Sequence, residues 1–130
     1  MNLSIIVPLF NEQNNILIVL NQLVETEYPP YLESVEFVIV DDHSTDQSFE
    51  VVKNFIADKK AFRLFRHEVN KGKGAAVKTG IQCANGDAFL VQDADLELSP
   101  SDIPAMVTAM NELNVQFING SRYLPGIARP

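Results

Sequence analysis

The chain has 130 residues, a length that suits a single domain, and 46% of them are apolar, enough to bury a core. Its formal net charge of −7 would repel a polyphosphate chain, so a nucleic acid is not the expected partner. The single cysteine, Cys83, excludes an intrachain disulfide and fits a reducing compartment. Its apolar neighbours indicate core packing rather than a nucleophile.

Short apolar runs alternate with amphipathic segments along the chain. Runs rich in β-branched and aromatic residues predict strands at residues 3–7, 36–40, 61–65, 88–91 and 115–118. Apolar residues at helical spacing predict helices around residues 16–23, 49–56, 76–84 and 103–110. Asn11 is the expected N-cap of the first helix, and Ser99 to Asp102 give a strong start signal for the last. This alternation predicts one α/β domain over residues 1–130, with a mainly parallel sheet between two helical layers.

Ligands of such sheets bind at the carboxyl ends of the strands, so the residues that follow each strand matter most. After the first strand, Phe10 could stack on a base and Glu12 could accept hydrogen bonds from a ribose or base. A plain strand-to-helix turn explains this segment equally well.

Two adjacent carboxylates, Asp41 and Asp42, end the second strand. They repel each other and lose hydration, so they need a ligand or local hydrogen-bond donors. Helix capping by Ser44 or Asp46 would account for those two residues but not for Asp41. His43 has no partner at metal-ligand spacing and is interpreted as a loop residue.

The third strand leads into a glycine-rich basic segment that contains Lys71, Lys73 and Gly74. Its glycines allow close backbone approach, and the free N–H groups of the following helix can face an anion. The spacing is not that of a P-loop, so the motif is weak by itself. His67, just before the segment, is expected at the surface.

The fourth strand is followed by Asp93, Asp95 and Glu97, which lie on one side of the chain if it stays extended. Hard oxygen ligands of this kind suit Mg²⁺ or Mn²⁺, with diphosphate oxygens completing the shell. The alternative is an acidic loop tip. After the fifth strand, Arg122 could reach a phosphate in bidentate fashion or could be an ordinary surface arginine.

Charge patterning supports an anionic ligand that arrives with a cation. Five of the ten Lys and Arg residues lie between Arg63 and Lys78, and five acidic residues follow between Asp87 and Asp102. Two separate solvated surfaces would give the same pattern.

Taken together, five segments resemble glycosyltransferase family 2 of the GT-A fold, and within it the polyprenyl-phosphate glycosyltransferases. They are residues 6–12, 40–46, 70–75, 93–97 and 120–123. The resemblance implies a Rossmann-like nucleotide-binding part. It implies a nucleotide-sugar site formed by Pro8, Phe10, Glu12, Asp41, Asp42, Lys73, Gly74 and Asp93. It also implies a metal site of Asp93, Asp95 and Glu97, with Asp93, Asp95 and Arg122 acting in catalysis.

Two positions depart from the commonest family pattern. Phe10 stands where Tyr is usual, and His43 where Gly is usual. Family members continue well beyond 130 residues with an acceptor-side region and often membrane helices, so we expect this chain to be the N-terminal part of a longer protein. The expected location is the cytoplasm, at the cytoplasmic face of a membrane that regions outside this chain would contact. The formation of homo-oligomers is left open.

The expected reaction is inverting transfer of a sugar from a GDP- or UDP-sugar to a polyprenyl phosphate such as dolichyl or undecaprenyl phosphate, with Mg²⁺ or Mn²⁺. A phosphate acceptor is already anionic at neutral pH and needs less help from a general base. One alternative is a nucleotide-binding module without catalysis. A weaker alternative is a signalling receiver domain, which the acidic strand end at Asp41 and Asp42 suggests but the preceding strand and helix oppose.

Overall fold

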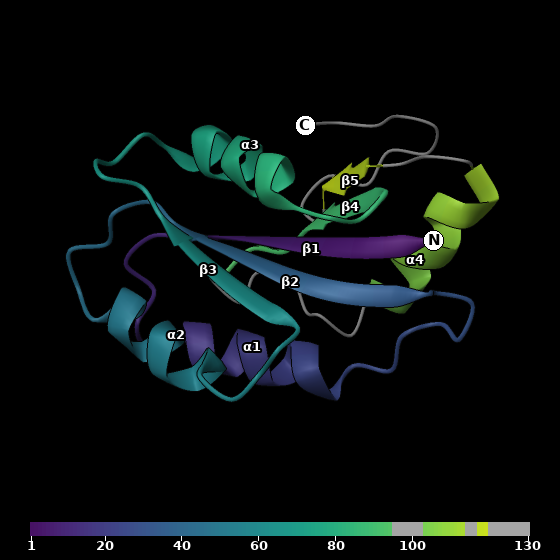
Figure 1. Cartoon of the computed structure of the whole chain (residues 1–130), viewed down its shortest axis with the longest axis horizontal. Helices are drawn as coiled ribbons and strands as arrows, with labels where there is room; N and C mark the ends of the chain where they lie inside the picture. The colour runs from purple at the N-terminus through teal and green to yellow at the C-terminus, as the bar shows by residue number, and fades with distance from the viewer. Residues whose placement is uncertain (95–102, 114–116, 120–130) are drawn as a thin grey trace.

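The structure, a computed structural model, describes residues 1–94, 103–113 and 117–119. The described elements alternate strictly along the chain, as the sequence pattern predicts (Figure 1). Strands and helices run in the order β1 (Asn2–Leu9), α1 (Ile16–Glu25), β2 (Ser34–Asp41), α2 (Ser48–Ile56), β3 (Phe62–Arg66), α3 (Lys73–Cys83), β4 (Ala88–Val91), α4 (Ile103–Leu113) and β5 (Phe117–Asn119).

The five described strands form one parallel sheet in the order β3-β2-β1-β4-β5. The chain first moves outward from the central strand β1 to β2 and β3, then returns to place β4 on the other side of β1. The direction in which successive strands are added to the sheet therefore reverses between β1 and β4. In open α/β sheets the crevice beyond such a switch point is where ligands bind.

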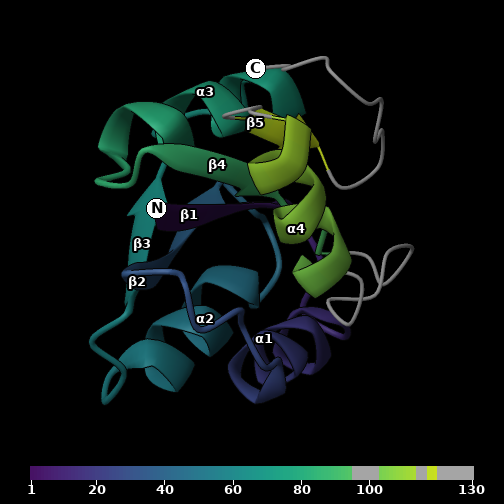
Figure 2. The ribbon, with the colours of Figure 1, turned by 90° about the vertical axis from the view of Figure 1, so that its right-hand side faces the viewer.

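Helices cover both faces of the sheet, which confirms the predicted three layers (Figure 2). On one face, buried side chains of α1, α2 and α4 pack against alternate residues of β1 such as Ile5 and Val7. On the other face, Ala76 and Val77 of α3 pack against Ile6. Helix α3 connects β3 to β4, which moves the chain across the sheet in the direction opposite to the β1-to-β2 and β2-to-β3 connections. A crossover of the same hand therefore places α3 on the face opposite α1 and α2.

Helix α3 packs closely against β1 at Gly80. A Cβ atom added there would lie 2.4 Å from Cγ2 of Ile6, whose side chain is fully buried. The small residues on this face of α3 therefore allow the helix to pack close to the sheet. Cys83 packs partly buried beside this cluster, as its neighbours in the sequence predict.

The predicted N-cap of the first helix is wrong. Helix α1 begins at Ile16 with Asn15 as its N-cap, four residues after Asn11. Asn11 instead adopts a left-handed backbone with φ of 50°, and its side-chain oxygen accepts hydrogen bonds from the backbone N–H groups of Thr45 and Asp46. It links the loop after β1 to the loop after β2. The helix start predicted at Ser99 to Asp102 lies outside the described residues.

Candidate active site

A cavity of about 370 Å³ opens at the carboxyl ends of β1, β2 and β4, at the switch point of the sheet. This volume is within the usual range for small-molecule sites. The chain contributes to it from four segments far apart in the sequence. Its lining consists of Pro8, Leu9, Phe10, Glu12, Asp42, Asn70, Gly72, Lys73, Ala76, Asp93 and Ala94.

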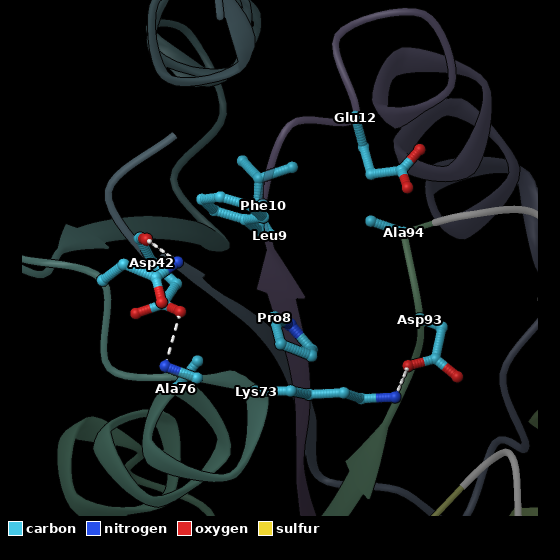
Figure 3. Close-up of a pocket in the computed structure, with 11 residues that line it drawn as sticks. Pro8, Leu9, Phe10, Glu12, Asp42, Lys73, Ala76, Asp93 and Ala94 are labelled. Carbon is cyan, nitrogen blue, oxygen red and sulfur yellow. Dashed lines mark hydrogen bonds and ion pairs between the residues drawn. The ribbon is translucent and has the colours of Figure 1, made fainter. Parts of the chain in front are cut away.

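Two acidic groups lie on opposite sides of this cavity, with Pro8 and Phe10 of the first strand end between them (Figure 3). Asp42 follows β2 on one side, and Asp93 follows β4 on the other. Phe10 is 44% exposed. An aromatic face that is open to solvent beside a carboxylate can stack on a planar base.

The carboxylate of Asp42 is almost fully buried, at 3% exposure, and three donors converge on it. Its Oδ1 accepts from Nδ1–H of His67 and from the backbone N–H of Lys71, and its Oδ2 accepts from the backbone N–H of Gly72, each at 2.8 Å. Burial raises the pKa of Asp42, but these hydrogen bonds outweigh burial and hold the pKa below its ordinary value. Asp42 is therefore a charged group that also fixes the glycine-rich loop.

His67 is buried, so the prediction that it lies at the surface is wrong. Its Nδ1 bonds Asp42, and its Nε2 lies 2.8 Å from the hydroxyl oxygen of Thr79 on α3. This chain of contacts ties the ends of β2 and β3 to α3. Neither His67 nor Thr79 belongs to a recognisable motif, and only the alternation of inward residues after Phe65 could have signalled the burial of His67.

Asp41 is fully buried and lies outside the lining of the cavity. Its side chain accepts from the backbone N–H and the hydroxyl of Ser44 and forms an ion pair with Nε of Arg66 at 3.1 Å. These local donors explain how two adjacent carboxylates coexist. The nucleoside-binding role of Asp41 stays a prediction.

The turn after Asp42 keeps the geometry that a glycine would give. His43 adopts a left-handed backbone with φ of 62°, and its Nδ1 lies 3.2 Å from the carbonyl oxygen of His67. Asp46 accepts a hydrogen bond from the backbone N–H of Ser48, the first residue of α2. Ser44 does not cap that helix, because its hydroxyl group donates to Asp41.

In the glycine-rich segment, the backbone N–H groups of Lys71 and Gly72, which precede α3, donate to Asp42. The anion contact expected from the N–H groups at the start of the helix stays a prediction. Lys73 instead extends along the cavity and pairs through Nζ with Oδ1 of Asp93 (Figure 3). Gly74 lies in the first turn of α3 and does not line the cavity. The basic and acidic segments of the sequence thus meet at Lys73 and Asp93.

Asp93 is 5% exposed, and its charge is balanced by the half-exposed ammonium group of Lys73. A nearly buried carboxylate that needs a cationic partner is suited to a divalent metal ion. The other predicted ligands, Asp95 and Glu97, and the predicted phosphate contact Arg122 lie outside the described residues. Within residues 1–94, 103–113 and 117–119, no three acidic, histidine or cysteine side chains gather as a metal site.

Comparison with known proteins identifies the family. The family model described as Glycosyl transferase family 2 matches residues 4–129, nearly the whole chain. The chain belongs to this family. Membership accounts for the sheet order and for the cavity at the switch point, and it removes the receiver-domain alternative.

Relatives of the chain include enzymes whose names contain dolichol phosphate or dodecaprenyl phosphate. The dolichol-phosphate mannosyltransferase of Pyrococcus furiosus is 32% identical over 128 residues, which are 97% of this chain and 34% of the relative. The dodecaprenyl-phosphate galacturonate synthase of Rhizobium johnstonii is 31% identical over 126 residues, which are 94% of this chain and 36% of the relative. The chain thus spans about a third of the length of these curated relatives.

Solved glycosyltransferase structures share the fold. S. aureus TarS in complex with UDP-GlcNAc has a TM-score of 0.72 and 26% identity, covering 96% of this chain and 37% of that one. The mannosyltransferase PcManGT from Pyrobaculum calidifontis, in complex with GDP-Man and Mn²⁺, has a TM-score of 0.73 and 26% identity, covering 90% and 35%. These likenesses confirm the GT-A fold.

Proposed function

We propose that this chain is the donor-binding part of an inverting, metal-dependent glycosyltransferase that transfers a sugar from a nucleotide diphosphate sugar to a polyprenyl phosphate. The observation that carries the proposal is the cavity at the switch point, which collects Phe10, Glu12, Asp42, Lys73 and Asp93. The aromatic ring and the Asp42 carboxylate suit a nucleoside at one side. The Lys73 and Asp93 pair suits a diphosphate and its cation at the other.

Each residue has a distinct task in this proposal. Phe10 would stack on the base, and Glu12 and Asp42 would accept hydrogen bonds from the nucleoside. Lys73 would turn from Asp93 to the diphosphate, where a positive charge stabilises the leaving group. Asp93, with Asp95 and Glu97, would hold Mg²⁺ or Mn²⁺, whose charge offsets that of the departing diphosphate.

The acceptor is proposed from its charge and from the relatives. An acceptor phosphate is ionised at neutral pH and can attack the anomeric carbon with little general-base help. Relatives named for dolichol and dodecaprenyl phosphates support this class of acceptor. Arg122 would meet donor or acceptor phosphate, and the reaction would take place at the cytoplasmic face of a membrane. Within the described residues no helix is long and apolar enough to cross a bilayer.

The metal centre is tested by calorimetry with UDP and GDP in the presence of Mn²⁺. Asp93→Asn and Asp95→Ala should bind the nucleotide much more weakly than the unmodified chain. Glu68→Gln is the matched control, because Glu68 is exposed and outside the cavity lining. Equal binding by all four proteins would remove the metal-centre assignment.

A further inference from the structure

The buried carboxylate of Asp42 has few acceptor positions left for a ligand. An ionised carboxylate offers about four lone-pair sites on its two oxygens. Oδ1 already accepts from His67 and from the backbone of Lys71, while Oδ2 accepts from the backbone of Gly72. Donors from the described part of the chain therefore fill three sites, and the remaining one is on Oδ2.

Burial restricts the same group further. Asp42 is 3% exposed, yet it lines the cavity, so a ligand reaches it through a small opening. The neighbouring Gly72 leaves this approach clear, since a Cβ atom added there would meet nothing within 4 Å. Its φ of 98° also holds the N–H toward Oδ2, in a conformation that other residues rarely adopt.

His67 occupies one of the acceptor sites on Oδ1 of Asp42 through a hydrogen bond. Because an ionised carboxylate only accepts, Nδ1 of His67 must carry the proton, whichever form the ring takes. The hydroxyl group of Thr79 at 2.8 Å from Nε2 holds the ring in this orientation. His67 does not itself line the cavity, so it acts on a ligand through Asp42.

Bases differ in the donors that they offer to such a carboxylate. Uracil has a single N–H at N3, between two carbonyl acceptors. Guanine presents N1–H beside the N2 amino group, a pair that matches both oxygens of a free carboxylate. With one acceptor site left on Asp42, this carboxylate cannot accept from both guanine donors. A desolvated donor left without a partner costs roughly five- to a hundredfold in affinity.

From this acceptor count we propose that the donor nucleotide is a uridine diphosphate rather than a guanosine diphosphate, with His67 as the positioning residue that enforces the choice. This inference rests on the proposed function, in which Asp42 binds the nucleoside. Asp42 accepts the single N3–H of uracil through Oδ2, while Phe10 stacks on the ring.

The test is calorimetry of the chain with UDP and with GDP, each with Mn²⁺ at neutral pH. UDP is expected to bind at least about fivefold more tightly than GDP. GDP binding that equals or exceeds UDP binding would overturn the inference and leave the proposed function intact. Failure of both nucleotides to bind would count against the proposed function itself.

Variants of His67 distinguish a positioning role from a loss of folding. The ratio of the UDP affinity to the GDP affinity is insensitive to the fraction of chain that is folded. His67→Phe keeps the buried ring but frees Oδ1, so the preference for UDP should fall severalfold. His67→Asn keeps a donor near the Nδ1 position and should restore the preference. An unchanged ratio in His67→Phe would show that His67 does not set the choice.

Discussion

The ion pair between Lys73 and Asp93 makes Lys73 a competitor for the metal ion. Of the described residues that line the cavity, Lys73 is the one cationic side chain. It balances a carboxylate that the proposed function assigns to Mg²⁺ or Mn²⁺. Replacing it with methionine keeps most of the side-chain length and removes the charge. Lys73→Met should therefore bind Mn²⁺ more tightly than the unmodified chain when no nucleotide is present.

The size of this effect follows from the exposure of the two partners. The side chain of Lys73 is 54% exposed, and that of Asp93 is 7% exposed. A pair with one exposed partner is screened by water, so its net value is about 1 kcal/mol rather than the several that a dry pair would have. The expected gain in Mn²⁺ affinity is about fivefold. Binding of UDP without metal should weaken, since the diphosphate loses a positive partner.

The assay is a titration of free Mn²⁺ by electron paramagnetic resonance, with no nucleotide added. Lys78→Met is the matched control, because Lys78 is exposed on the same helix and lies outside this cavity. The reasoning is refuted if Lys73→Met binds Mn²⁺ no more tightly than Lys78→Met, since Lys73 would then not compete for the carboxylate.

Three further predictions test the base stack, the packing of α3 and the charge of Asp42. Phe10→Ala should lose about 1–3 kcal/mol of nucleotide affinity by calorimetry, while Phe10→Tyr should lose little. Gly80→Ala should lower the free energy of unfolding by about 1–3 kcal/mol in urea because of Ile6, whereas Gly74→Ala has open space and should not. Hydrogen bonds lower the pKa of Asp42 in the folded state, so its contribution to stability is full above the unfolded pKa of about 4 and is lost as the pH falls below it. Urea melts should therefore show that the free energy of unfolding falls less between pH 6 and pH 3 in Asp42→Asn than in the unmodified chain.

Each of these three predictions can fail independently. Unchanged nucleotide affinity in Phe10→Ala would place the base elsewhere. Equal stability of the Gly80→Ala and Gly74→Ala variants would mean that the α3 layer adjusts freely. A pH dependence in Asp42→Asn as steep as that of the unmodified chain would assign the acid sensitivity to other carboxylates.

Much of the fold could be predicted from the sequence, because it depends on local patterns. Apolar runs set the strands, and helical spacing set the segments between them. The position of the cavity followed as well, because the carboxyl ends of parallel strands share one edge of the sheet. Pro8, Phe10, Glu12, Asp42 and Asp93 accordingly lie around one cavity.

Contacts between loops far apart in the sequence could not be predicted. Asn11 looked like a helix cap but bonds a loop more than thirty residues away. His67 looked like a surface residue but bonds Asp42. Asp41 and Asp42 looked equivalent, yet successive residues of a strand point to opposite sides, so one meets Arg66 while the other lines the cavity.

The central claim is that a nucleotide and its metal ion bind together at the switch point of the sheet. Nuclear magnetic resonance of the ¹⁵N-labelled chain with UDP tests it most directly, using Mn²⁺ as a paramagnetic probe. The account predicts that Mn²⁺ broadens the amide signals of Lys73, Asp93 and Ala94, and that UDP with Mg²⁺ shifts those of Phe10 and Gly72. Signals at the opposite ends of the strands, such as those of residues 34–36, should stay unchanged. Broadening centred at that opposite edge, or no effect at the cavity, would contradict the account.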